Sequence, residues 1–169
     1  MEAYDETKIG KPISRAADHT VYHYASDRVI KFSRLEYILG RRAKGRVEQD
    51  LEICRKFFGH YLLETTILRS PDGKRTALVQ PFIAGEYLEK KHLSDSELAR
   101  QFYDIIERLN KLTTVGYGPL DLIGQGGAIF PCLSNIFVVN DNRLRIIDTT
   151  ILDPRDLGFW TVILKPIVS

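Results

Sequence analysis

Two residues of the types that bind metal ions stand at the outer ends of a predicted β-hairpin. Asn135 comes just before an apolar strand at 136–139, and Asp148 comes just after a second apolar strand at 144–147. A hairpin brings its outer ends together, so the amide oxygen and the carboxylate would lie side by side. Both are hard oxygen ligands, which suit Mg²⁺ when substrate phosphates occupy other positions around the ion. The same residues also fit an ordinary core hairpin that begins in an Asx turn, so both interpretations stay open.

Lys31 is another residue whose position suggests chemistry with phosphate. It follows Val29 and Ile30 in a predicted strand at 29–33. A positive charge fixed on a rigid strand can stabilise anionic oxygens. A surface lysine on an edge strand would give the same local pattern, and only the place of Lys31 in the order of predicted elements favours the functional interpretation.

Hydrophobic patterning predicts an α+β scaffold that positions these residues. Residues of β-type favour strands at 9–13, 20–24, 29–33, 61–68 and 76–81. Turns are predicted at 25–28 and at 70–73. After the third strand, apolar residues at helical spacing predict a helix that ends at Gly59, with a face made of Val47, Leu51, Cys54 and Phe58. This order predicts an antiparallel sheet covered by one helix.

The second half of the chain is predicted to begin with a connector at 84–93. A second helix is expected to start at Ser94, whose hydroxyl would form a capping box with Glu97. This helix ends near Thr113, because the loop at 116–134 opens with glycines and a proline that cannot continue it. The hairpin and a short apolar tail complete the chain.

Composition excludes some classes of protein. A length of 169 residues fits one domain or two small lobes, and a net charge of +2 is too small to argue for nucleic acid or an anionic membrane as a partner. Cys54 and Cys132 provide neither a disulfide framework nor a zinc-binding spacing. The first residues lack the features of a signal peptide, so a cytoplasmic location is expected, with delivery by a leaderless secretion route left open.

Taken in order, these features resemble protein kinases and aminoglycoside-type phosphotransferases, over roughly residues 9–156. Lys31 resembles the lysine of the Val-Ala-Ile-Lys strand, which contacts the α- and β-phosphates of ATP. Asn135 resembles the asparagine that closes the catalytic loop. Asp148 resembles the aspartate of the Asp-Phe-Gly motif, with Thr149 and Thr150 standing where Phe and Gly usually do.

The resemblance implies a two-lobed kinase-like fold. Residues 1–83 would form an N-lobe-like, five-stranded antiparallel sheet with one helix, and residues 84–93 would form the hinge or connector. Residues 94–169 would form a strongly shortened C-lobe with a helix, a catalytic-type loop and the metal-site hairpin.

The resemblance also implies a site for ATP and Mg²⁺. Lys31 would hold the phosphates, and Glu48 on the following helix would orient it, with Glu52 one turn away as the alternative. Gln80 and Phe82 lie in the segment that resembles the hinge, where backbone groups would pair with the adenine edge. Asn135 and Asp148 would hold Mg²⁺, as the hairpin itself suggests.

Several residues depart from the kinase pattern. The segment 14–22, where a glycine-rich phosphate loop is expected, contains no glycine, although Ala16 and Ala17 are small. Phe130 stands where the catalytic aspartate is expected, and a phenylalanine cannot accept a hydroxyl proton. Asp121, which follows the second helix, would replace it if an insertion separates it from Asn135; turn formation is its alternative role. Beyond Asp148 little chain remains, and it includes two acidic residues, Asp153 and Asp156, that resemble those of small-molecule phosphotransferases.

Three functions follow from these observations and stay open. The first is an ATP-dependent phosphotransferase that acts on a hydroxyl group of a protein or small molecule. The second is a catalytically inactive, pseudokinase-like binding or regulatory module, which the missing glycines and Phe130 favour. The third is a nucleotide-free α+β interaction protein.

Overall fold

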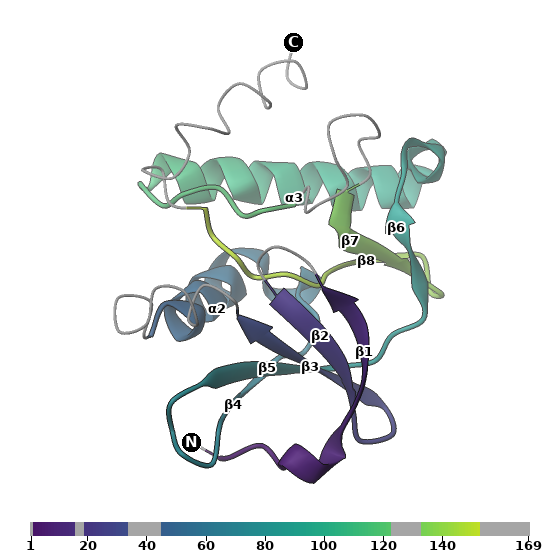
Figure 1. Ribbon diagram of the computed structural model, residues 1–169. Helices are drawn as coiled ribbons and strands as arrows, with labels where there is room; N and C mark the ends of the chain where they lie inside the picture. The colour runs from purple at the N-terminus through teal and green to yellow at the C-terminus, as the bar shows by residue number, and fades with distance from the viewer. Residues whose placement is uncertain (1, 16–18, 34–44, 123–132, 153–169) are drawn as a thin grey trace. The chain divides into compact units, whose positions relative to one another are not determined.

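The computed structural model describes residues 2–15, 19–33, 45–122 and 133–152 (Figure 1). The chain divides into two compact units, each described by itself. Unit 1 comprises Met1–Gln49 and Leu62–Ala84, and unit 2 comprises Asp50–Tyr61 and Gly85–Ser169. The division falls inside helix α2 (Arg46–Phe58), so that the first turn of this helix belongs to unit 1 and the remainder to unit 2.

Unit 1 is built on a five-stranded antiparallel sheet with the strand order β1-β2-β3-β5-β4. Its strands are β1 (Ile9–Arg15), β2 (His19–Tyr24), β3 (Arg28–Ser33), β4 (Thr66–Arg69) and β5 (Thr76–Pro81), preceded by the 3₁₀ turn η1 (Glu6–Lys8). The predicted five-stranded sheet is thus confirmed.

The strand predicted at 61–68 is wrong in its first half. Helix α2 ends at Phe58, and Gly59, with φ +43°, leads into the 3₁₀ turn η3 (Gly59–Tyr61). Residues 59–61 form this turn, and pairing with β5 begins only at Thr66. The turn predicted at 70–73 is present: Gly73, at φ +69°, donates its N–H to the carbonyl of Ser70 at 2.8 Å.

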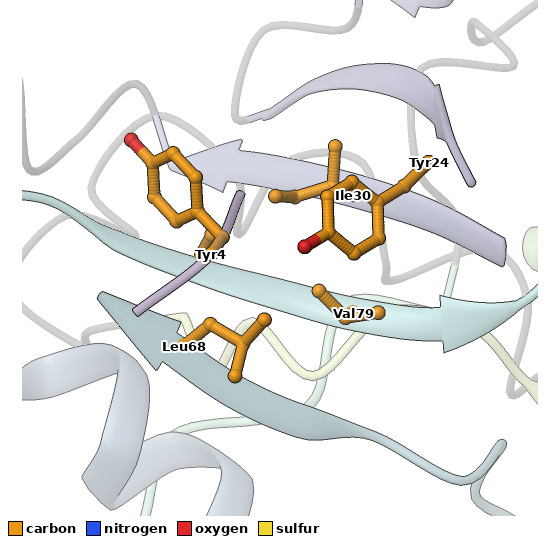
Figure 2. Close-up of a cluster of buried hydrophobic side chains, with 6 residues drawn as sticks. Tyr4, Tyr24, Ile30, Leu68 and Val79 are labelled. Carbon is orange, nitrogen blue, oxygen red and sulfur yellow. The ribbon is translucent and has the colours of Figure 1, made fainter. Parts of the chain in front are cut away.

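One face of the sheet in unit 1 carries an apolar cluster (Figure 2). It consists of Tyr4, Tyr24, Ile30, Leu68, Ala77 and Val79. Side chains two residues apart along a strand point to the same face, and for this reason alternate residues of neighbouring strands meet in the cluster. Tyr4 comes from the N-terminal segment, whose backbone pairs with Arg69 (Tyr4 N to Arg69 O, 2.9 Å), and this pairing covers the outer edge of β4.

Unit 2 contains a three-stranded antiparallel sheet with the order β6-β7-β8, together with helix α3. Its elements are β6 (Gly85–Leu88), the 3₁₀ turn η4 (Lys90–Ser94), α3 (Ser96–Thr114), β7 (Leu133–Val139) and β8 (Arg143–Ile146). The predicted hairpin is present as β7 and β8, with Asn142 at φ +54° in its turn. Among the described residues, no helix has the length and apolar character needed to cross a membrane.

The start of the expected connector is instead a strand, β6, paired with β7. Gly85 permits this pairing, because a Cβ atom at this position would lie only 2.6 Å from the backbone oxygen of Val138. The rings of Tyr87 and Phe137 then meet edge to face across the two strands, with centroids 4.8 Å apart. The physical role of Gly85 is thus to let a neighbouring strand approach closely.

Helix α3 is capped by Asp95, so the prediction that Ser94 caps this helix is wrong. The Asp95 carboxylate accepts hydrogen bonds from the backbone N–H groups of Glu97 at 2.9 Å and Leu98 at 3.1 Å. Ser94 ends the preceding η4 turn, and its hydroxyl donates to the carbonyl of Lys91 at 2.8 Å. Aspartate and serine are equally good caps, and the η4 turn decides between them because it uses Ser94.

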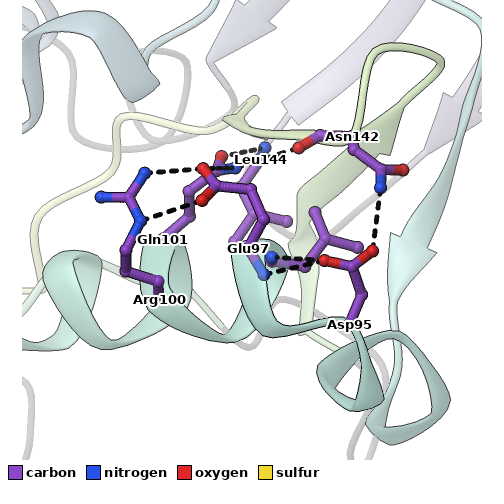
Figure 3. A network of polar contacts seen from close by, with 7 residues as sticks. Asp95, Glu97, Arg100, Gln101, Asn142 and Leu144 are labelled. Carbon is purple, nitrogen blue, oxygen red and sulfur yellow. Dashed lines mark hydrogen bonds and ion pairs between the residues drawn. The ribbon is translucent and has the colours of Figure 1, made fainter.

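The side chain of Gln101 joins α3 to the turn of the β7–β8 hairpin (Figure 3). Gln101 is buried, its Oε1 accepts from the N–H of Leu144 at 2.9 Å, and its Nε2 donates to the carbonyl of Asn142 at 2.9 Å. The Asn142 side chain in turn donates to the capping residue Asp95 at 2.9 Å. The helix and the hairpin of unit 2 are therefore held together by polar contacts as well as by apolar packing.

Replacing Gln101 by leucine is expected to destabilise unit 2. The buried N–H of Leu144 and the carbonyl of Asn142 would both lose their side-chain partner, and an unsatisfied buried polar group costs about 1–3 kcal/mol. Urea unfolding followed by circular dichroism measures this loss. Arg100→Leu on the same helix is the control, because the exposed Arg100 makes only surface bonds to Glu97. Equal unfolding midpoints for the two variants would contradict the role given to Gln101.

Candidate functional site

Lys31 lies in the interior of the sheet of unit 1. Strand β3 runs between β2 and β5, with Lys31 opposite Val21 on one side and Leu78 on the other. Its neighbour Ile30 belongs to the apolar cluster, so that Lys31 points to the opposite face, where it is 8% exposed. The alternative of a surface lysine on an edge strand is therefore excluded.

Glu48, in the first turn of α2, reaches the sheet face that carries Lys31. Its Oε1 accepts a hydrogen bond from Nη2 of Arg69 at 2.6 Å. Cross-strand register places Arg69 on the face of Lys31: Lys31 opposes Leu78, Leu78 opposes Ile67, and Arg69 is two residues beyond Ile67. A carboxylate and two cationic side chains thus belong to one face of unit 1.

The ion pair of Glu48 is with Arg69, whereas the sequence predicts a pair with Lys31. The other oxygen, Oε2, is buried and has no hydrogen-bond partner within the described part of the chain. Glu52, the alternative to Glu48, is exposed, and the structure therefore favours Glu48 as the acidic residue of this face. Sequence reasoning missed Arg69, because nothing in the local pattern separates it from the other arginines.

Gln80 and Phe82, the residues assigned to the hinge, both take part in contacts within unit 1. Gln80 is 1% exposed, and its Nε2 donates to the hydroxyl of Thr65 at 2.9 Å. The N–H of Phe82 donates to the carbonyl of Asp27 at 2.7 Å, and its ring is 54% exposed beside His23. The Gln80 side chain and the Phe82 N–H therefore serve the fold, and contact of this segment with an adenine edge stays a prediction.

In unit 2, Asn135 and Asp121 are joined directly. The Asn135 side chain donates through Nδ2 to the backbone carbonyl of Asp121 at 2.8 Å. The Asn135 carbonyl accepts from the N–H of Ile147 at 3.0 Å, and the N–H of Asp121 donates to the carbonyl of Thr150 at 3.0 Å. The Asp121 backbone, the Asn135 side chain and the Thr150 carbonyl therefore form one hydrogen-bonded group, and the catalytic role expected of Asp121 in place of Phe130 stays a prediction.

The carboxylate of Asp148 is held by the second threonine that follows it. Its Oδ1 accepts from Thr150 N at 2.9 Å and from Thr150 Oγ1 at 2.8 Å. The thiol of Cys54 donates to the carbonyl of Thr149 at 3.5 Å. Burial raises the pKa of the Cys54 thiol, and the carboxylates of Asp50 and Asp148 raise it further, so the thiol stays protonated and can donate this bond. The sequence identified Cys54 only as part of an apolar face.

The side-chain oxygen atoms of Asn135 and Asp148 are of the kind that Mg²⁺ binds. Because Nδ2 of Asn135 faces a carbonyl, Oδ1 is the atom that would bind the metal. Both bonds from Thr150 go to Oδ1 of Asp148, so Oδ2 is the oxygen that Thr150 leaves for an ion. Within the described ranges no group of three or more His, Cys, Asp or Glu residues gathers around a common point. Such an ion would thus need phosphate and water oxygens for its other positions, which is how Mg²⁺ is usually held.

Some residues named in the sequence analysis lie outside the described residues. They are Ala16, Ala17, Phe130, Cys132, Asp153 and Asp156, together with the apolar tail. The assignments made for them stay predictions.

Neither a model of a protein family nor a curated protein sequence matches this chain. Among solved structures, the chain is similar to the crystal structure of the kinase domain of PknI from Mycobacterium tuberculosis, determined as a double mutant. The TM-score is 0.55 at 14% sequence identity, and the match covers 86% of this chain and 58% of the PknI domain. The fold is thus similar to that of a protein kinase domain, and the chain spans little more than half the length of that domain.

The pair of Glu48 and Arg69 can be tested by a double-mutant cycle. We expect Arg69→Met and Glu48→Gln to show a coupling energy of about 1–3 kcal/mol in urea unfolding, because the pair is a short charge-assisted hydrogen bond between mostly buried side chains. The control cycle combines Glu48→Gln with Arg75→Met, since Arg75 is an exposed arginine on the same hairpin. A coupling energy no larger than that of the control would show that the ion pair does not form in solution.

Proposed function

We propose that this chain is a kinase-like protein that binds ATP with Mg²⁺ and transfers a phosphoryl group to a hydroxyl of a protein or small molecule. The observation that supports this most is the hydrogen bond from Asn135 to the carbonyl of Asp121, because it joins the residue assigned to the acceptor hydroxyl to a residue assigned to the metal. The similarity to a kinase domain supports the same assignment through the fold. Residues 1–83, 84–93 and 94–169 would serve as N-lobe, connector and reduced C-lobe.

Each residue has a distinct role in this proposal. Lys31, a cation fixed on an interior strand, would contact the phosphates, and Glu48 would orient it. Asn135 and Asp148 would hold Mg²⁺, which neutralises charge on the phosphate oxygens when bound. The carboxylate of Asp121 would orient the acceptor hydroxyl and accept its proton. Gln80 and Phe82 would lie in the segment that faces the adenine.

Replacement of Asp148 tests the binding of nucleotide and metal. In calorimetric titrations, the wild-type protein is expected to bind ATP more tightly with Mg²⁺ than without it, and Asp148→Ala is expected to lose this difference because a carboxylate ligand is removed. Asp141→Ala is the matched control, since Asp141 is an exposed aspartate in the turn of the same hairpin. Absence of ATP binding to the wild type in both conditions would discard the proposal and favour a nucleotide-free interaction protein.

A second function, an inactive pseudokinase-like binding module, is favoured by one observation. Glu48 is paired with Arg69, while the proposed chemistry needs it to orient Lys31. Such a module would bind nucleotide or a protein partner without transferring phosphate.

Replacement of Asp121 distinguishes the two functions. Asp121→Ala keeps the backbone N–H and carbonyl that bond to Thr150 and Asn135, so the local fold should persist. For a phosphotransferase we expect phosphate transfer from labelled ATP to fall about 10²–10⁴-fold in this variant, with ATP binding retained, because the proton acceptor is lost. If the wild type binds MgATP but transfers no more phosphate than Asp121→Ala, the inactive module is the better description.

A further inference from the structure

Thr150 makes contacts with Asp148 that the glycine of the Asp-Phe-Gly motif could not make. Its N–H and its hydroxyl both donate to the same carboxylate oxygen, Oδ1, at 2.9 Å and 2.8 Å. A glycine at this position would offer only the N–H. Two donors from one residue fix the torsion of the carboxylate, so Oδ2 is held in a defined direction.

Thr150 is itself anchored by residues from a distant part of unit 2. Its carbonyl accepts from the N–H of Asp121 at 3.0 Å, and the next residue, Ile151, bridges to Leu120. One residue later, the N–H of Leu152 donates to the carbonyl of Pro119 at 2.9 Å. The backbone around Thr150 is thus paired with the segment that carries Asp121. This pairing fixes the position of the backbone from which the threonine hydroxyl extends.

The first threonine anchors the same segment from its other side. Thr149 is 4% exposed, and its carbonyl accepts from the thiol of Cys54 in α2 at 3.5 Å. Asp50, one helical turn before Cys54, accepts from the N–H of Ile151 at 3.4 Å. Contacts from α2 and from the Asp121 segment therefore hold Thr149 and Ile151, the two chain neighbours of Thr150. The side chain of Thr150 itself bonds to Asp148.

We infer that Thr150 is a positioning residue that holds Oδ1 of Asp148 and thereby presents Oδ2 to a divalent cation. This inference rests on the proposed function, since it needs Asp148 to be a metal ligand. Hydrogen bonds to a ligating carboxylate orient it, and removal of such outer contacts typically weakens metal binding about 10–100-fold. The competing interpretation is a local turn in which an aspartate and a threonine only shape the chain. The two interpretations differ in the response to metal.

The experiment measures the Mg²⁺ concentration that gives half-maximal enhancement of ATP binding. Thr150→Val keeps the shape and the N–H but removes the hydroxyl, and we expect it to raise this concentration about tenfold or more. Thr150→Ser keeps the hydroxyl and should behave as the wild type. Thr149→Val is the matched control, because it makes the same change at the neighbouring threonine. The contact of Thr149 with Cys54 uses the backbone carbonyl, which this substitution leaves in place. Affinity for ATP in the presence of EDTA should be the same in all four proteins.

Each outcome bears on the inference in a defined way. Wild-type-like dependence on Mg²⁺ in Thr150→Val would overturn the inference and leave the proposed function intact. Absence of Mg²⁺-dependent ATP binding in the wild type would overturn both. Equal weakening of ATP binding with and without Mg²⁺ would indicate a structural role and also overturn the inference. Circular dichroism checks folding, and Thr150→Ala, which removes the hydroxyl with less bulk, replaces the valine variant if that variant unfolds.

Discussion

The hydrogen bond from the Asn135 side chain to the Asp121 carbonyl is the contact on which the arrangement in unit 2 depends. The β7–β8 hairpin forms from local pairing, and its outer ends meet without help from elsewhere. Asp121, by contrast, lies outside the hairpin, and its backbone is held by Asn135 on one side and by Thr150 on the other. Without these bonds, the hairpin would still form, but the carboxylate of Asp121 would have no fixed relation to Asn135 and Asp148.

The fold was predictable where the signal is local. Runs of β-type residues predicted the sheet of unit 1, and turn residues predicted its hairpins, because both depend on neighbours in sequence. The errors arose where a distant partner decides. Gly85 is a strand residue because the backbone of Val138 comes within 2.6 Å of the position a Cβ would take, and no local pattern contains that information. Similarly, the η4 turn decides that Asp95 rather than Ser94 caps α3.

In the candidate site, too, local features were predictable and contacts between distant segments were not. Residue types and their order predicted Lys31, Asn135 and Asp148 as candidates, since two of these positions lie on strands and Asp148 follows shortly after one. The partners were not predictable, because hydrogen bonds between segments depend on packing. The position of Arg69 beside Glu48 depends on the pairing of β4 with β5, which the local sequence does not show. Thr150, read from sequence as a departure from the kinase pattern, becomes informative once its hydroxyl is seen on Asp148.

The pairing of Glu48 with Arg69 does not by itself decide between an active and an inactive protein, because a carboxylate has two oxygens. Arg69 occupies Oε1, while Oε2 is buried without a hydrogen-bond partner in the described ranges, an arrangement that costs about 1–3 kcal/mol. A donor at Oε2 would remove this cost, and Lys31 is a second cation on the same sheet face. The same sheet face therefore carries both Arg69, the observed partner of Glu48, and Lys31, the partner that the proposed function requires, so the Glu48–Arg69 pair is compatible with an active and with an inactive protein.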